Sequence, residues 1–108
     1  LGQCKFHQKT HFRTAPEAVI DKKFTSKSDV WSYGIVLYEI ITWGGDPYPD
    51  FNSVQSLVKE LVNGYRIIKP VNCPDGFYSQ MYACWLEKPL SRPSFFELYT
   101  VFNNYLKN

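Results

Sequence analysis

The feature that most constrains this fold is the run from Val30 to Ile41, which is interrupted by only a few small or polar residues. Its apolar side chains cover all sides of a helical wheel, whereas a helix at a protein surface carries one apolar stripe. The run is shorter than the roughly 18 to 20 apolar residues that cross a bilayer. We therefore predict a helix over residues 29–42 in the middle of the fold, packed by neighbours on every face.

Capping residues and helix breakers mark the ends of this helix. Residues 25–29 (Thr-Ser-Lys-Ser-Asp) offer several candidate N-caps. Residues 44–49, which are rich in glycine and proline, form a loop after it. Upstream, Pro16 suits the first turn of a helix, so a short helical turn is predicted there. Residues 1–13 show no clear period and are predicted to be loop.

Apolar stripes predict further helices in the second half of the chain. Asn52 and Gln55 have the spacing of a capping box. They precede a one-sided stripe over residues 53–63, which is typical of a surface helix. Another helix is predicted from Asp75 to Leu86. Its apolar side carries Phe77, Met81, Cys84 and Trp85.

Pro89 and Pro93 interrupt the chain before a last helix. Ser94 and Glu97 are spaced as a second capping box at its start. The apolar stripe of this helix consists of Phe95, Leu98, Phe102 and Tyr105. The isoleucine pair at residues 67–68 is too short to predict a strand. The predicted fold class is therefore all-α.

Composition narrows the class of protein. The chain has 108 residues, 44% of them hydrophobic, which suits one small folded domain. Its 3 Trp, 8 Tyr and 8 Phe need a sizeable core or a partner surface to cover them, which indicates a piece of something larger. The net charge of +2 is spread along the chain, so nucleic acid is not an expected partner. The 3 cysteines are widely spaced and odd in number, which favours a reduced, intracellular setting over a disulfide framework.

The N-terminal segment contains Cys4, His7 and His11 at spacings that zinc could use. A structural zinc site needs four ligands, and the next cysteine, Cys73, is remote in sequence. We therefore predict no metal site. Residues 1–5 have no signal-peptide layout and do not start with Met, so we expect the natural chain to continue upstream.

Short motifs occur in a fixed order along the chain. They are Thr-Ala-Pro-Glu-Ala at residues 14–18, Ser-Asp-Val-Trp-Ser-Tyr-Gly at 28–34, Gly-Asp-Pro-Tyr-Pro at 45–49, Cys-Trp at 84–85 and Arg-Pro-Ser-Phe at 92–95. In this order and spacing they resemble the C-terminal half of a protein tyrosine kinase catalytic domain. A single tripeptide would be weak evidence, whereas the ordered set is strong.

The resemblance implies a fold and a domain assignment. It implies the C-terminal helical part of a protein-kinase-like fold, with a short helix after the Ala-Pro-Glu motif, a buried central helix and three flanking helices. Residues 13–108 would be a partial kinase domain, and residues 1–12 a divergent activation segment. The usual activation-loop tyrosine is absent, since no Tyr precedes Tyr33. Residues 81–85 with 87–89 look like cytoplasmic kinases of the Tec and Src kind, whereas residues 44–45 and 69–73 look more like fibroblast-growth-factor-receptor kinases, so the subtype stays open.

The resemblance also implies roles for particular side chains. Glu17 and Arg92 resemble the buried ion pair of the family. Without the surrounding motifs, the simpler interpretation would be two charged residues at the surface. Asp29 resembles the carboxylate that accepts backbone N–H bonds from the catalytic loop, and its plain alternative is an acid that favours a helix N-terminus. Arg13 and Thr14 would flank the substrate pocket. The remaining structural residues of the motifs are Ala15, Pro16, Trp31, Gly34 and Trp85.

The parts of a kinase that carry out phosphoryl transfer are not found in this sequence. Transfer needs a Gly-rich loop, a strand lysine, a catalytic-loop Asp and Asn, and an Asp-Phe-Gly motif for Mg²⁺. We therefore predict no catalytic residue and no cofactor or metal in this chain, whereas the complete family domain binds ATP and Mg²⁺.

The predicted function is that of a protein tyrosine kinase fragment, inactive by itself. Its expected partners are a protein or peptide tyrosine substrate and the missing N-terminal part of the kinase domain, with no nucleic acid and no membrane segment. The expected location is intracellular, in the cytoplasm or on the cytoplasmic side of a receptor. The alternatives are a non-catalytic interaction module, such as a pseudokinase or truncated product, and a fragment that does not fold stably.

Overall fold

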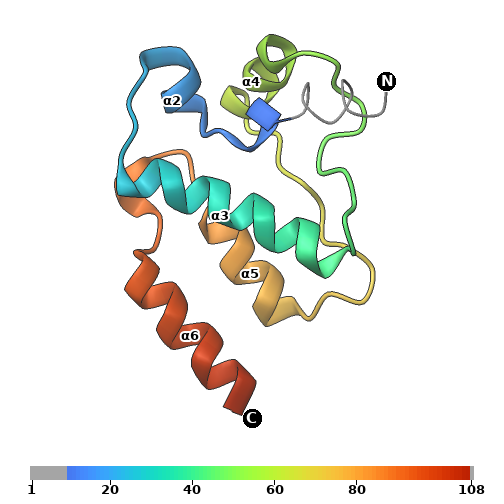
Figure 1. The fold of residues 1–108 in the computed structure, drawn as a ribbon, viewed down its shortest axis with the longest axis vertical. Coiled ribbons are helices and arrows are strands. Elements are labelled where there is room, and N and C mark those ends of the chain that lie inside the picture. The colour runs from blue at the N-terminus through green and yellow to red at the C-terminus, as the bar shows by residue number, and fades with distance from the viewer. Residues whose placement is uncertain (1–9, 108) are drawn as a thin grey trace.

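The structure is a computed structural model that describes the backbone of residues 10–107, and every regular element in that range is helical (Figure 1). The all-α prediction is thus confirmed. The elements are the 3₁₀ helix η1 (Thr10–Arg13), α2 (Pro16–Asp21), α3 (Ser26–Ile41), α4 (Val54–Val62), α5 (Asp75–Ala83), the 3₁₀ helix η2 (Pro89–Ser91) and α6 (Phe95–Lys107).

Helix α3 is the centre of the arrangement. It contacts α5, η1 and η2, while α2 packs against α4 at one end of the molecule. Figure 1 shows α5 behind α3, α2 and α4 above it, and α6 leading away below it to the C-terminus. The largest side chains buried around α3 are Trp31, Trp85, Arg92, Tyr48 and Ile35.

The start of α3 is set by a hydroxyl capping box. The Thr25 N–H donates to Ser28 Oγ over 2.7 Å, and the Ser28 N–H donates to Thr25 Oγ1 over 3.3 Å. These bonds satisfy backbone donors that the first turn of a helix leaves without partners. The helix consequently begins at Ser26, ahead of the predicted start at Asp29.

The prediction that α3 is packed on every face is wrong. Val30, Trp31 and Ile35 are fully buried, but Val36 is 37% and Ile40 is 68% exposed. The described neighbours α5, η1 and η2 therefore cover one side of the helix and leave a stripe of the other side bare. Apolar side chains on all sides of a helix predict that every side is buried in the complete fold. They do not indicate which residues bury each side.

Several predicted boundaries shift for local reasons. Residues 10–13 form η1 and not loop. The N-cap of α4 is Ser53 and not Asn52, because Ser53 has extended backbone angles and its Oγ accepts the Ser56 N–H over 3.2 Å. Gln55 therefore takes no part in a capping box there. Helix α5 begins at Asp75 as predicted but ends at Ala83, before the predicted end at Leu86.

The capping box of α6 is confirmed. The Ser94 N–H donates to Glu97 Oε1 over 2.8 Å, and the Glu97 N–H donates to Ser94 Oγ over 3.0 Å. Of the apolar stripe predicted for this helix, Leu98 is buried and Phe102 packs on the core, while Phe95 is 44% exposed. The Tyr105 side chain lies outside the described residues.

Helix α3 comes close to the C-terminal end of α5 at Gly34. A Cβ atom at this position would lie 2.7 Å from Cys84 Cβ and 2.7 Å from Trp85 Nε1. Such contacts are shorter than van der Waals packing allows, and both neighbours are fully buried. Gly34 is therefore needed for space and not for an unusual backbone conformation.

We predict that Gly34→Ala lowers the free energy of unfolding by about 1–3 kcal/mol, because the added methyl group overpacks the α3–α5 contact. Urea unfolding of the 108-residue chain, followed by circular dichroism, measures this change. Gly76→Ala is the matched control, since Gly76 is an exposed residue in the first turn of α5. Alanine there should leave stability unchanged or raise it. Equal stability of Gly34→Ala and the wild type would contradict the packing described.

Candidate functional site

The site is built around the buried guanidinium of Arg92. It forms a bidentate ion pair with Glu17, in which Nη1 donates to Oε2 over 2.8 Å and Nη2 donates to Oε1 over 3.0 Å. The Arg92 side chain is 1% exposed and that of Glu17 is 16% exposed. The pair joins the start of α2 to the chain after η2, so it connects segments that are 75 residues apart. The predicted Glu17–Arg92 pair is present with parallel, charge-assisted geometry.

Carbonyl oxygens take the remaining donors of Arg92. Nε donates to the Leu86 carbonyl over 2.8 Å, Nη1 to the Lys27 carbonyl over 3.1 Å, and Nη2 to the Glu87 carbonyl over 3.5 Å. A guanidinium has five N–H donors, and each of them has an acceptor here. The buried charge is therefore fully compensated, which is the condition under which an arginine tolerates burial.

Two guanidinium groups lie over the ring of Trp31 in α3. The Cζ atoms of Arg66 and Arg92 are each 5.0 Å from the Trp31 ring. Arg66 is held by the Trp85 carbonyl, which accepts from Nε over 2.7 Å, and by the Leu61 carbonyl, which accepts from Nη1 over 2.9 Å. Burial lowers the pKa of Arg66 from its ordinary value. Cation–π contacts on Trp31 thus connect the Glu17–Arg92 ion pair (the latch) to the loop after α4.

The segment that leads to the latch is fixed to α3 through Ser32 and Glu39. Arg13 Nε donates to Glu39 Oε1 over 2.9 Å, and Ser32 Oγ donates to the Arg13 carbonyl over 2.7 Å. Ala15 is 1% exposed, and Pro16 occupies the first turn of α2. The structure thereby holds residues 13–17 at both ends, by Arg13 on α3 and by Glu17 on Arg92.

The remaining predicted residues fall into two groups. Trp31, Gly34 and Trp85 meet in the core beneath Arg92. Asp29 lies in the first turn of α3 with its side chain exposed, and Thr14 lies half-buried between η1 and α2. The indole N–H groups of Trp31 and Trp85 are buried without an acceptor among the described residues.

Sequence reasoning missed three contributors to this site. Lys27 donates from Nζ to the Arg92 carbonyl over 2.6 Å, Arg66 stacks on Trp31, and Glu39 pairs with Arg13. Glu39 could have been identified from the sequence, because it is the one charged residue within the apolar run of α3. Nothing in the sequence identifies Lys27 or Arg66 as part of the site. Their partners are backbone carbonyls and, for Arg66, an aromatic ring that is remote in sequence.

The described cysteines, Cys73 and Cys84, are buried free thiols. Burial raises the pKa of Cys84 to about 12, although the charge of Arg92 acts in the opposite direction. The described residues contain no cluster of His, Cys, Asp and Glu fit to hold a metal ion. The zinc-type spacing lies outside this range, because Cys4, His7 and the His11 side chain are not described. Among the helices of residues 10–107, none combines the length and apolarity needed to cross a membrane.

Comparison with known proteins gives consistent matches. A family model for protein tyrosine and serine/threonine kinases matches residues 4–102. Human ephrin type-A receptor 5 is 42% identical over 95 residues, which are 88% of this chain and 9% of the receptor. Human tyrosine-protein kinase FRK is 50% identical over 82 residues, 76% of this chain and 16% of that kinase.

A further relative extends the comparison. Tyrosine-protein kinase SPK-1 of Girardia tigrina is 48% identical over 91 residues, covering 79% of this chain and 18% of that kinase. This chain thus spans less than a fifth of the length of these curated relatives.

We predict that Glu17→Gln lowers the free energy of unfolding by about 3–5 kcal/mol, because it leaves the Arg92 charge buried without its counter-charge. Arg92→Leu should be similarly costly, and the double variant should cost less than the sum of the two. Lys69→Met is the matched control, because the Lys69–Asp75 pair is exposed and a surface ion pair contributes little to stability. Additive costs for Glu17→Gln and Arg92→Leu in urea unfolding would show that the pair is not coupled.

Cys84 gives a prediction about alkaline pH. Its folded-state pKa of about 12 lies above the ordinary value of 9.0, so the folded chain holds the thiol proton more tightly. The resulting stability is fully present below pH 9 and is lost as the pH rises towards 12. Cys84→Ala should therefore flatten the fall of the unfolding free energy in this window. The measurement is a series of urea titrations between pH 9 and 12. If the unfolding free energy of Cys84→Ala falls as steeply with pH as that of the wild type, the raised pKa of Cys84 is refuted.

Proposed function

Because this chain belongs to the family of protein tyrosine and serine/threonine kinases, we propose that it forms the helical, substrate-side part of a kinase that phosphorylates tyrosine side chains of proteins. Its similarity to two tyrosine-protein kinases, together with the kinase family model, identifies it as a fragment of a protein tyrosine kinase. We assign residues 13–108 to the partial kinase domain and residues 1–12 to a divergent activation segment.

The observation that carries this proposal is the double attachment of residues 13–17. Arg13 is tied to α3 through Glu39 and Ser32, and Glu17 is tied to Arg92. A chain segment held at both ends by partly buried polar contacts is a rigid platform. Arg13 and Thr14 lie on this platform, and we propose that they flank the pocket that receives the substrate tyrosine. Rigid placement of a substrate is a large part of catalysis in phosphoryl transfer.

Phosphoryl transfer itself would come from residues outside this sequence. The family needs a Gly-rich loop, a strand lysine, a catalytic Asp and an Asp-Phe-Gly motif, which this chain does not contain. We propose that the part of the kinase carrying them packs against the bare side of α3, where Val36 and Ile40 are exposed, and meets Asp29 at the start of that helix. ATP and Mg²⁺ would bind to that part.

We also propose an intracellular location for the complete protein. Free, buried thiols at Cys73 and Cys84 support it, because extracellular chains more often use their cysteines in disulfides.

A chimera tests the proposal. Residues 13–108 replace the matching segment of human tyrosine-protein kinase FRK, and the product is assayed with ATP and a tyrosine-containing peptide. We expect phosphorylation of this peptide and none of its phenylalanine analogue. The 108-residue chain alone should give no turnover above buffer, because it contains no catalytic residue.

The control in this assay is Leu90→Ala, since Leu90 is 89% exposed in η2 next to the latch. It should leave the chimera active, whereas Arg92→Leu should lower its activity by about tenfold or more, since breaking a buried pair costs several kcal/mol. A chimera that is folded by circular dichroism yet inactive would contradict the proposal, as would turnover by the isolated chain.

A further inference from the structure

Tyr65 differs from the other exposed tyrosines of the described part of the chain in its backbone. The exposed tyrosines there are Tyr65 at 39%, Tyr82 at 40% and Tyr99 at 64%. Tyr82 lies in α5 and Tyr99 in α6, whereas Tyr65 follows α4 in a segment without regular structure. The two residues before it, Asn63 and Gly64, are also exposed. A second protein can therefore reach the backbone around Tyr65 as well as its hydroxyl group.

The two helical tyrosines are less accessible to an enzyme that must hold the backbone on both sides of its target. Tyr82 follows Met81 in α5, and Tyr99 follows Leu98 in α6, and both of these neighbours are fully buried. Unwinding either helix would expose the buried side chain to water, which is unfavourable. The segment before Tyr65 has no such obstacle, since its residues are already exposed.

The Tyr65 ring belongs to an aromatic cluster with Tyr48 and Phe51. Its centroid lies 5.6 Å from that of Phe51, edge to face, and 6.4 Å from that of Tyr48. Tyr48 is 1% exposed and lies in the loop that follows α3. The ring of Tyr65 thus attaches this loop to the chain after α4, through contacts that stabilise the folded state.

The hydroxyl end of Tyr65 lies near an acidic group. Burial raises the pKa of Tyr38 in α3, and the Asp46 carboxylate and the Tyr65 hydroxyl raise it further. Both groups must therefore lie close to the Tyr38 hydroxyl. Asp46 is held in place, because its Oδ1 accepts the Tyr48 N–H over 3.0 Å. A negative charge added to Tyr65 would consequently be repelled by a fixed carboxylate.

The adjacent cation, Arg66, is already engaged. Its Nε donates to the Trp85 carbonyl over 2.7 Å, and its Nη1 donates to the Leu61 and Tyr65 carbonyls over 2.9 and 2.6 Å. Its guanidinium also lies 5.0 Å from the Trp31 ring. Arg66 would have to leave these partners to compensate an anion on Tyr65.

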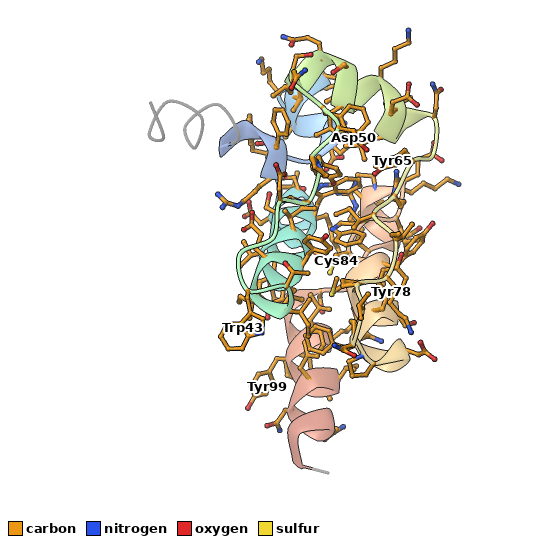
Figure 2. All side chains as sticks on the ribbon, turned by 90° about the vertical axis from the view of Figure 1, so that its right-hand side faces the viewer. Trp43, Asp50, Tyr65, Tyr78, Cys84 and Tyr99 are labelled. Carbon is orange, nitrogen blue, oxygen red and sulfur yellow. The ribbon has the colours of Figure 1, made fainter. Side chains whose placement is uncertain are left out.

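This cluster does not lie on the bare side of α3. Tyr38 and Ile40 are two residues apart, so their side chains leave the helix about 200° apart. Figure 2 shows Tyr65 just below α4, and Trp43 at the edge of the molecule on the α3 side. The surface around Tyr65 is therefore distinct from the surface that the proposed function gives to the rest of the kinase.

We propose that Tyr65 is a phosphorylation site for a separate protein tyrosine kinase, and that the phosphate releases the Tyr65 ring from the aromatic cluster. The Tyr65 Oη attacks the γ-phosphorus of ATP, the bond from that phosphorus to the β–γ bridging oxygen breaks, and ADP leaves. The hydroxyl proton passes to a base of the acting kinase and then to water. The phosphate carries about −1.5 to −2 charges at pH 7. Repulsion by Asp46 and hydration of the phosphate then favour a Tyr65 side chain turned into solvent.

Phosphate mapping tests the site. The 108-residue chain is incubated with human tyrosine-protein kinase FRK, ATP and Mg²⁺, and its phosphopeptides are quantified by mass spectrometry. We expect most of the phosphate on Tyr65, so Tyr65→Phe should remove most of the incorporation. The matched control is Tyr82→Phe, because Tyr82 is equally exposed but helical. It should leave incorporation unchanged. The chain is the substrate in this assay, so the result does not depend on the chimera.

Synthetic peptides separate the fold from the sequence preference of FRK. Residues 60–70 contain Tyr65 as their single tyrosine, and residues 79–88 contain only Tyr82. The ratio of the Tyr65 rate to the Tyr82 rate should be at least about tenfold higher in the folded chain than between the peptides, because α5 must unwind first. Equal ratios, or more phosphate on Tyr82 or Tyr99 than on Tyr65, would overturn the proposal.

Thermal unfolding tests the release of the ring. The midpoint of the phosphorylated chain should be lower by about 4–8 °C, the shift expected for the loss of one or two aromatic contacts in a chain of this size. Asp46→Asn should make this decrease smaller, because it removes the charge while its amide oxygen can still accept the Tyr48 N–H. Tyr65→Phe keeps the ring and should unfold close to the wild type. No decrease on phosphorylation, or an equal decrease in Asp46→Asn, would show that the ring is not released by repulsion.

Discussion

The structure depends on the buried Arg92 guanidinium more than on any other single group. Its five donors reach Glu17 and three backbone carbonyls, and its face lies over the Trp31 ring. An arginine is buried at acceptable cost only when every donor is used. Each of those acceptors must therefore stay in place, so one side chain holds together α2, α3 and the chain around η2.

The consequence for function is a division of α3 into two sides. One side carries Trp31, Gly34 and Ile35 against the latch and α5, and it holds residues 13–17 in a fixed position. The other side carries apolar residues that no described element covers. In the proposed function, the covered side would hold the segment that flanks the substrate, and the bare side would seat the catalytic part.

Local sequence signals were sufficient for most elements and insufficient for their ends and neighbours. The α6 capping box could be predicted because Ser94 and Glu97 satisfy each other's backbone within one turn. The same pattern misassigned the α4 cap to Asn52, since an Asn and an adjacent Ser compete and only the backbone angles decide between them. The roles of Lys27 and Arg66 had no signal, because carbonyl acceptors are present at every residue.

By itself the sequence determined the helical class, which follows from periodicity, and the ordered family motifs, whose resemblance to kinases implied the pairing of Glu17 with Arg92. Only the tertiary structure decided which side of α3 is covered, that Gly34 is needed for the space of Trp85, and that Tyr65 is exposed beside Phe51. The physical reason is that burial and steric contact belong to pairs of segments brought together in space, and a single segment does not encode its neighbour.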